Sequence, residues 1–318
     1  MAKKSRSPKK TFLWVTDPWQ TLDHAHDTTL RLAEAAQRLG HRSLWSAPPH
    51  WAIQKGKLAI QAAPLEKFGA ADMPTGFSTV ASSAFHQLHY RVDPPVDDAY
   101  RAPLESIVTL GDSKLSERVI NPLKALLTRS SKLEPLALPG FNLPTVMSAD
   151  RAALLRGLEQ MKDAVIKPMN SAQSKGVVRV SVGGGSETVI REATQGFKQP
   201  VLMQPYLKEI QGGEMRLWFI DGHCLGALRK FPLKGDFRVL IDEGSRTEGA
   251  ELTPRLKAQA KSVGAHLKRH GMRIAAVDWI GDHVTDFNFT SPGLLRELER
   301  AHQKPFAEEI IDRLARKG

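Results

Sequence analysis

The segment 284–289, with the sequence VTDFNF, carries the most informative polar side chains of the chain. It has the alternation of a β-strand, in which successive side chains point to opposite faces. Asp286 and Asn288 therefore share one face, whereas the two phenylalanines point toward a core. The apolar run 274–280 predicts the partner strand of a hairpin, and Asp278 lies on it. A three-residue turn puts Asp278 directly across from Asp286, and a two-residue turn puts it one step diagonal.

Two carboxylates that face each other across a sheet repel, and this arrangement destabilises the strands. A chain tolerates it most easily when a cation lies between the carboxylates. Oxygen ligands alone, from Asp278, Asp286 and Asn288, suit magnesium, which takes one or two carboxylates together with phosphate oxygens. These residues therefore predict a magnesium site, and the alternative is a solvated polar face of a strand.

Basic residues at predicted strand ends indicate a second part of the same site. Lys167 ends the apolar run AVIK and precedes the loop NSAQSKG. A lysine there can reach a phosphate held by the backbone donors of the loop, although an ordinary strand-end lysine has the same pattern. Arg216, Arg229 and Arg238 lie on successive predicted strands or their connections. Guanidinium groups suit carboxylates and phosphates, but each arginine alone is typical of a protein surface.

The first part of the chain has the pattern of a parallel α/β sheet. Residues 11–16 and 42–46 read as buried strands, and residues 28–39 have helical spacing before Gly40. Strand, helix, strand in this order starts a parallel sheet. A hairpin is expected at 51–66 and a further strand at 85–92.

The second part has a different pattern. Residues 110–148 are helix-like but punctuated by prolines, which places the first domain boundary near 120. The remaining expected elements are helices at 152–161, 254–270 and from 296 onward, strands at 164–167 and 177–182, and strands of a second sheet at 200–204, 215–220 and 224–230. Asp221-Gly222 predicts the turn of a hairpin.

Composition limits the class of protein. The 318 residues have globular values, with 41% hydrophobic and 25% charged residues and a formal net charge of +11. The single cysteine, Cys224, excludes an intrachain disulfide and fits a reducing cytoplasm. No apolar run approaches the roughly 20 residues that span a bilayer, so no membrane association is expected. Residues 1–10 are expected to form a disordered basic tail. Because nucleic-acid motifs are absent, nucleic acid is not expected as the main partner.

Several segments together resemble bacterial glutathione synthetase, a member of the ATP-grasp ligases, with some features of the ligases that add glutamate to protein tails. The segments that carry the resemblance are RVDPPVD (91–97), VIKP (165–168), QPYLKEI (204–210), GGEMRLWFIDG (212–222) and VDWIGDHVTDFNFTSP (277–292). The resemblance implies an α/β ATP-grasp fold, in which ATP lies between two α+β subdomains that follow an N-terminal parallel-sheet domain. It places the N-terminal substrate-binding domain at 11–120, the lid subdomain at 121–200 and the C-terminal subdomain with the metal site at 201–318.

The resemblance also implies roles for individual residues. Those expected to bind ATP are Lys132, Lys167, Gln204, Tyr206, Leu207 and Glu209. Those expected to bind magnesium, or manganese, are Asp278, Asp286 and Asn288. Arg216 and Arg229 are expected to stabilise the phosphates and the acyl phosphate. Arg238, the third arginine expected at the catalytic centre, is expected to hold substrate. Those expected to hold substrate are Arg91, Ser291 and Pro292.

Two departures from the family pattern concern the phosphate-covering loop and the region that faces the substrates. The phosphate-covering loop is glycine-rich in the family, but residues 170–176 contain one glycine here, and Leu240 stands where an asparagine is usual. The resemblance implies an ATP-dependent carboxylate–amine ligase that acts on small acidic peptides or amino acids and forms a homo-oligomer. A ligase for an amino acid or a protein tail, and a nucleotide-binding regulatory protein without catalysis, are the alternatives.

Overall fold

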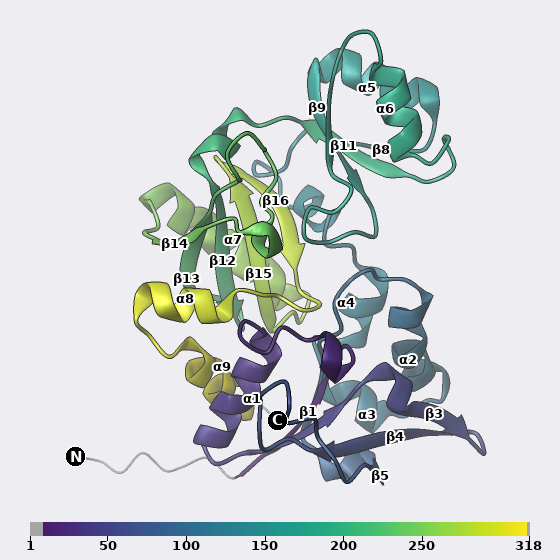
Figure 1. The fold of residues 1–318 in the computed structure, drawn as a ribbon, viewed down its shortest axis with the longest axis vertical. Helices are drawn as coiled ribbons and strands as arrows, with labels where there is room; N and C mark the ends of the chain where they lie inside the picture. Colours follow the sequence, from purple (N-terminus) through teal and green to yellow (C-terminus); the bar gives the residue numbers. More distant parts are fainter. Residues whose placement is uncertain (1–8, 317–318) are drawn as a thin grey trace.

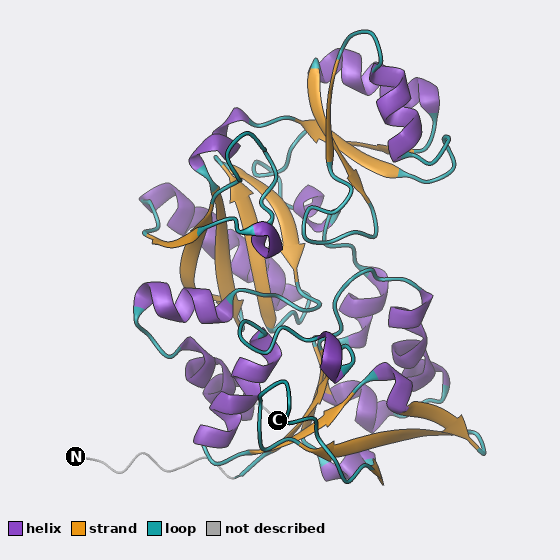
Figure 2. Cartoon of the chain, in the orientation of Figure 1, coloured by secondary structure: helices purple, strands orange, loops and turns teal. Residues whose placement is uncertain are grey.

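The computed structural model describes residues 9–316, and these residues form three β-sheets with helices packed around them (Figures 1 and 2). The predicted basic tail, residues 1–10, lies almost wholly outside the described residues. Each sheet is formed by a different region of the chain. Among residues 9–316, none of the helices is both long and apolar enough to cross a bilayer.

The N-terminal sheet has a parallel centre, as predicted. Strands β2, β1, β6 and β7 lie in this order, and all three pairings are parallel. Their bounds are Thr11–Val15 for β1, Arg42–Ser46 for β2, Gln87–Tyr90 for β6 and Val119–Ile120 for β7. The hairpin of β3 (Trp51–Gln54) and β4 (Lys57–Pro64) extends the sheet beyond β2, and β5 (Ser78–Val80) pairs with β4. Helix α1 (Thr28–Arg38) begins at Asp27, whose side chain accepts the Leu30 N–H.

The proline-punctuated segment 110–148 forms short pieces instead of one helix. Helix α2 (Asp98–Thr109) precedes it, and α3 (Ser113–Arg118) and α4 (Leu123–Thr128) are six residues each. A 3₁₀ turn, Glu134–Ala137, follows. Backbone of this connection then runs along the free edge of β16, because Phe287 N–H donates to the Ser131 carbonyl at 3.1 Å.

The lid sheet corrects one prediction. Its antiparallel order is β10, β9, β11, β8, with β8 Val146–Ser148, β9 Asp163–Pro168, β10 Val178–Ser181 and β11 Val201–Pro205. The strand predicted at 200–204 was assigned to the second sheet, but β11 pairs with β8 and β9. Val201 and Met203 pack with helices α5 (Arg151–Met161) and α6 (Ser186–Ala193) in the core of the lid. A boundary at 200 therefore cuts this sheet, and the chain leaves it only after Pro205.

The C-terminal sheet has the order β14, β13, β12, β15, β16 and is antiparallel. The strands are β12 Glu214–Ile220, β13 His223–Lys230, β14 Thr247–Ala250, β15 Ile274–Ile280 and β16 His283–Asn288. Helix α7 (Pro254–Arg269) covers one face. Helices α8 (Leu295–His302) and α9 (Phe306–Arg316) pack on the other and join it to the N-terminal sheet through α1. Figure 1 shows α9 lying between the two sheets beside α1.

Local geometry settles the register that the sequence left open. Ile280 pairs with His283, so the β15–β16 turn has two residues. A bulge then shifts the register between Asp278 and Trp279, and Asp278 pairs directly with Asp286. The extra residue on β16 is Thr285, since Val284 pairs with Trp279. The two carboxylates face each other although the turn is the shorter one.

Candidate active site

A cavity of about 1180 Å³ lies where the three sheets meet. Its wall includes the ends of β9 and β11, the polar face of the C-terminal sheet, and loops of the N-terminal domain. Most of the predicted site residues line it: Lys132, Lys167, Gln204, Tyr206, Leu207, Arg216, Arg238, Asp278, Asp286, Asn288, Ser291 and Pro292. The cavity therefore collects predicted residues that lie between Lys132 and Pro292 in the sequence.

Asp278 lies at the floor of the cavity with four donors around its carboxylate. Arg216 donates to it twice, from Nε to Oδ1 at 2.9 Å and from Nη2 to Oδ2 at 2.8 Å. Lys230 Nζ lies 3.2 Å from Oδ1, and Asn288 Nδ2 donates to Oδ2 at 3.1 Å. Burial alone would raise the pKa of Asp278, but the charges of Arg216 and Lys230 hold it well below its usual range. Asp278 is therefore ionised and already neutralised by protein cations.

The same cations connect Asp278 to a second carboxylate. Lys230 Nζ contacts Glu214 Oε2 at 2.6 Å, and both side chains are largely buried. Thr285 Oγ1 donates to Glu214 Oε1 at 3.3 Å. Although burial opposes its charge, the neighbouring Asp278 raises the pKa of Arg216 above its usual value. Two carboxylates and two cations thus form a buried network of zero net charge.

Asp286 and Asn288 are the residues best able to take a cation. Asp286 Oδ1 accepts the N–H of Phe287 at 3.0 Å, which leaves most of its acceptor positions facing the cavity. Asn288 uses its amide nitrogen on Asp278, so its carbonyl oxygen is left as an acceptor. No group of three His, Cys, Asp or Glu side chains among residues 9–316 could hold a metal by itself. One free carboxylate and one amide oxygen fit magnesium that shares its remaining ligands with phosphates. A cation at Asp278 requires one of its donors to give way.

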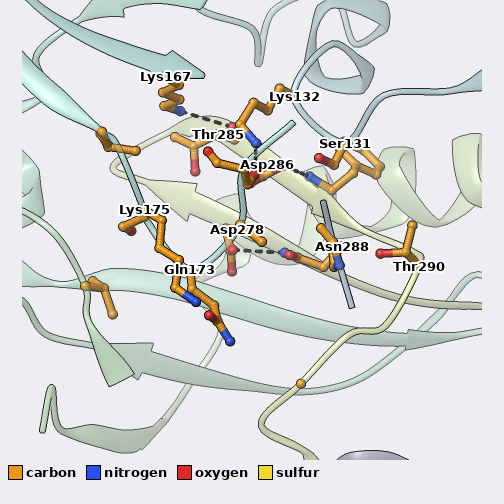
Figure 3. A pocket seen from close by; sticks show the side chains of 18 of the residues that line it. Ser131, Lys132, Lys167, Gln173, Lys175, Asp278, Thr285, Asp286, Asn288 and Thr290 are labelled. Carbon is orange, nitrogen blue, oxygen red and sulfur yellow. Dashed lines mark hydrogen bonds between the residues drawn. The ribbon is translucent and has the colours of Figure 1, made fainter. Parts of the chain in front are cut away.

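Two lysines lie above this pair. Figure 3 shows Lys132 beside Asp286, with Lys167 approaching from the lid. Lys132 Nζ donates to the Ser171 carbonyl of the loop 169–176, and Lys167 Nζ donates to the Thr285 carbonyl at 3.4 Å. Burial, together with the charge of Lys167, lowers the pKa of Lys132. Two ammonium groups that repel each other in one cavity are suited to a polyanion.

The connection after β11 forms another wall of the cavity. Gln204 is buried, and its amide nitrogen donates to Thr145 Oγ1 at 3.0 Å. The guanidinium of Arg179 lies 3.7 Å from the centroid of the Tyr206 ring. Tyr206 also meets the ring of Phe237 edge to face, at 6.0 Å between centroids. Two aromatic rings, of Tyr206 and Phe237, thus line the cavity on this side.

The N-terminal domain supplies an acidic end of the cavity, which includes Asp17, Asp27 and Asp93. Burial and the neighbouring charge of Asp17 raise the pKa of Asp93 to about 6, although Ser291 donates to it. Arg91 does not line the cavity. Its side chain is buried and donates to Thr29 Oγ1 at 2.8 Å and to the Pro292 carbonyl at 2.9 Å.

Arg91 therefore holds the loop that carries Ser291 and Pro292, and the loop, not the guanidinium, faces the cavity.

The β13–β14 connection adds a further wall. Arg238 is bound by Asp236, with Nη2 2.7 Å from Oδ2. Leu240, nearly buried, donates its N–H to Ser245 Oγ at 2.9 Å and lines the cavity.

Besides Arg91, two predicted residues are not brought to the cavity. Arg229 pairs with Met215 of β12. The side chains of both residues lie on the face of the sheet that α7 covers, opposite the face that bears Arg216 and Asp278. Its stem lies over Gly213. Glu209 is exposed beside Gly281, in the β15–β16 turn. The cation that does face the site is Lys230, one residue after Arg229. Alternation along LRKFP was the signal that could have found it, once the face of β13 was known.

Comparisons with known proteins agree on the family. A family model described as the prokaryotic glutathione synthetase ATP-grasp domain matches residues 131–303, and one described as the N-terminal domain of the same enzyme matches residues 11–126. The glutathione synthetase of Xanthomonas campestris pv. campestris is 31% identical over 295 residues, 90% of this chain and 91% of that protein. That of Parasynechococcus marenigrum is 29% identical and covers 95% of this chain and 98% of its own.

Solved structures agree on the fold. The D-cycloserine synthetase DcsG superposes with a TM-score of 0.70 at 19% identity, over 96% of this chain and 99% of its own. The ATP-grasp ligase PsnB, in complex with a minimal precursor, gives 0.60 at 18% identity, over 95% of this chain and 99% of its own. The ATP-grasp fold predicted from the sequence is thereby confirmed.

Proposed function

The chain belongs to the prokaryotic glutathione synthetase family, and we propose that its cavity joins a small peptide or amino-acid carboxylate to an amine at the positions described above. The protein is an ATP-dependent ligase that forms an amide bond through an acyl phosphate. The observation that carries the assignment of the site is the convergence of Lys132, Lys167, Arg216 and Lys230 on the face that bears Asp286 and Asn288.

The reaction has two steps. An oxygen of the substrate carboxylate attacks the γ-phosphorus of ATP, the bond to the β-phosphate oxygen breaks, and an acyl phosphate and ADP result. The amine nitrogen then attacks the acyl carbon, phosphate leaves with the bonding electrons, and the amine loses a proton. Neither step needs a nucleophilic side chain, so positioning and charge neutralisation are the work of the protein.

The residues of the cavity divide this work. Lys132 and Lys167 hold the phosphates, and Arg216 lies where it can neutralise charge on the transferred phosphoryl group. Asp286 and the carbonyl oxygen of Asn288 would hold magnesium, with manganese as the alternative cation. Either cation, when bound, neutralises charge on phosphate oxygens. Gln204, Tyr206 and Leu207 provide the surface on which the base of the nucleotide lies.

The acidic end of the cavity supports a substrate with a cationic amine. Asp17, Asp27 and Asp93 line the cavity from the N-terminal domain, whereas Lys167 comes from the lid, so the cavity offers complementary charge to both groups of a zwitterionic amino acid or peptide. We propose γ-glutamylcysteine as the acid and glycine as the amine to test first, because the relatives are named glutathione synthetases and glutathione is the amide of these two compounds. Leu240 and Phe237 favour a second candidate, an amine with an apolar side chain, because they make part of the wall apolar.

Location and assembly stay predictions. The single cysteine supports the cytoplasm, where thiols are reduced. A homo-oligomer is expected from the family resemblance, and analytical ultracentrifugation tests it.

The experiment is ADP release from MgATP with a panel of acids and amines. The panel contains γ-glutamylcysteine, free amino acids and a glutamate-ended peptide as acids, and glycine, leucine and glutamate as amines. Turnover that needs one acid and one amine supports the proposal, and the pair identifies the substrate. ATP binding without ADP release from any pair would support the regulatory alternative instead.

A further inference from the structure

The buried carboxylate of Glu134 lies outside the roles assigned above. It is 6% exposed and lies in the 3₁₀ turn Glu134–Ala137, two residues after Lys132. Arg129 Nη1 contacts its Oε1 at 2.6 Å, and His266 Nε2 of α7 lies 2.7 Å from its Oε2. Arg129 Nη2 also lies 2.7 Å from His270 Nδ1 at the end of α7. Glu134 therefore ties the connection 129–137 to α7 from two sides.

This tie fixes a short stretch of backbone. The N–H groups of Leu133 and Glu134 both donate to the Ser130 carbonyl at 3.0 Å, which makes a tight turn. The next carbonyl, of Ser131, accepts the N–H of Phe287 on β16. Lys132 follows at once, and Figure 3 shows it beside Asp286, which precedes Phe287 in β16. Lys132 and Glu134 thus belong to one turn, and both line the cavity, but the Glu134 carboxylate contacts His266 of α7.

The packing of α7 against β16 also links the turn 130–134 to this strand. The His266 ring meets the Phe287 ring at 5.7 Å between centroids, so the partner of Glu134 also packs against the strand that pairs with Ser131. A buried carboxylate that loses its partners costs far more than an exposed one, and a segment held by such a group has one preferred position.

We propose that Glu134 is a positioning residue for ATP binding. By tying the turn 130–134 to His266 and Arg129, it holds Lys132 beside Asp286. The inference rests on the proposed function of Lys132. The Glu134 side chain does not itself touch the nucleotide in this role, and its effect on ATP passes through Lys132.

A double-mutant cycle separates this role from a general structural one. MgATP binding is measured by calorimetry for the wild type, Glu134→Gln, Lys132→Met and the double variant, with Glu309→Gln as control. Glu309 forms an exposed ion pair with Arg313 on α9 and has no contact with the site. Glu134→Gln should weaken binding about tenfold in the wild type and less than about twofold in the Lys132→Met background. An equal loss in both backgrounds overturns the proposal.

Steady-state kinetics and hydrogen exchange complete the test. With the acid–amine pair that gives turnover, Glu134→Gln should raise the KM for ATP more than it lowers kcat. Without nucleotide, it should speed exchange of the Phe287 amide, which donates to Ser131, while Glu309→Gln leaves that exchange unchanged. If the wild type binds no ATP, the proposed function fails, whereas unchanged exchange at Phe287 in Glu134→Gln refutes the clamp itself.

Discussion

The buried network beneath the cavity makes Lys230 a stability determinant that can be tested without a substrate. Lys230 contacts both Glu214 and Asp278, and the side chains of the three residues are 5%, 15% and 5% exposed. Methionine matches its length and apolar stem but has no charge. Lys230→Met leaves two buried carboxylates to share the single guanidinium of Arg216, so one negative charge is uncompensated.

The expected loss follows from this count of charges. Breaking a buried ion pair by removing one partner destabilises proteins by about 3–5 kcal/mol. A matched exposed pair is Lys162 with Glu159, at 3.3 Å and with side chains 72% and 63% exposed. Lys162→Met should cost roughly 0–1 kcal/mol. The free energy of unfolding from denaturant titration of both variants gives the comparison.

A third variant checks the cause. Glu214→Gln combined with Lys230→Met removes one charge of each sign, and Asp278 keeps its two bonds from Arg216. The double variant should therefore be more stable than Lys230→Met alone, because the excess negative charge is gone. If Lys230→Met loses no more free energy than Lys162→Met, or if the added Glu214→Gln lowers stability further, the network does not act as described.

Three further outcomes follow from the site. Asp286→Ala, and separately Asn288→Ala, should lower kcat for ADP release by about 100-fold or more, and turnover that survives both changes refutes the metal assignment. Arg229→Ala should change kcat/KM by less than about threefold, because its side chain lies on the α7 face; a larger loss measured in the same assay restores the sequence prediction. Because the pKa of Asp93 is raised to about 6, its ionisation opposes folding, so the wild type should lose stability relative to Asp93→Asn as pH rises from about 4 through 6. Melting temperatures of both proteins at pH 4 and 8 measure this, and an equal difference at the two values contradicts it.

Local patterns predicted most elements because they depend on neighbours in the chain. The strand predicted at 11–16 is apolar from Phe12 to Val15 and becomes the fully buried β1, and the helical spacing at 28–39 becomes α1. Sheet membership depends on partners far apart in sequence. Nothing within 200–204 distinguishes a strand that pairs with β9 from one that pairs with β12, and the prediction for it was wrong.

The site was predictable in its residue types more than in its faces. The hairpin pattern is local and short, and it correctly placed Asp278 across from Asp286, with Asn288 two residues further along β16. Arg229 was predicted and Lys230 was not considered, because only the register with β12 shows which of the two faces the side of Arg216. Glu134 was not predicted, because its partner His266 lies on a helix more than a hundred residues later and the nearby Arg129 alone does not mark it.

The physical basis for the metal site also changes once the structure is known. The sequence argument held that two carboxylates across a sheet need a cation between them. Asp278 and Asp286 do face each other, but Arg216 and Lys230 neutralise the first and Lys132 lies beside the second. Repulsion between them is therefore relieved by the protein itself. Support for magnesium rests instead on the acceptor atoms that these cations leave open, which are those of Asp286 and the carbonyl oxygen of Asn288. These acceptors lie beside Lys132, which is suited to bind a polyphosphate.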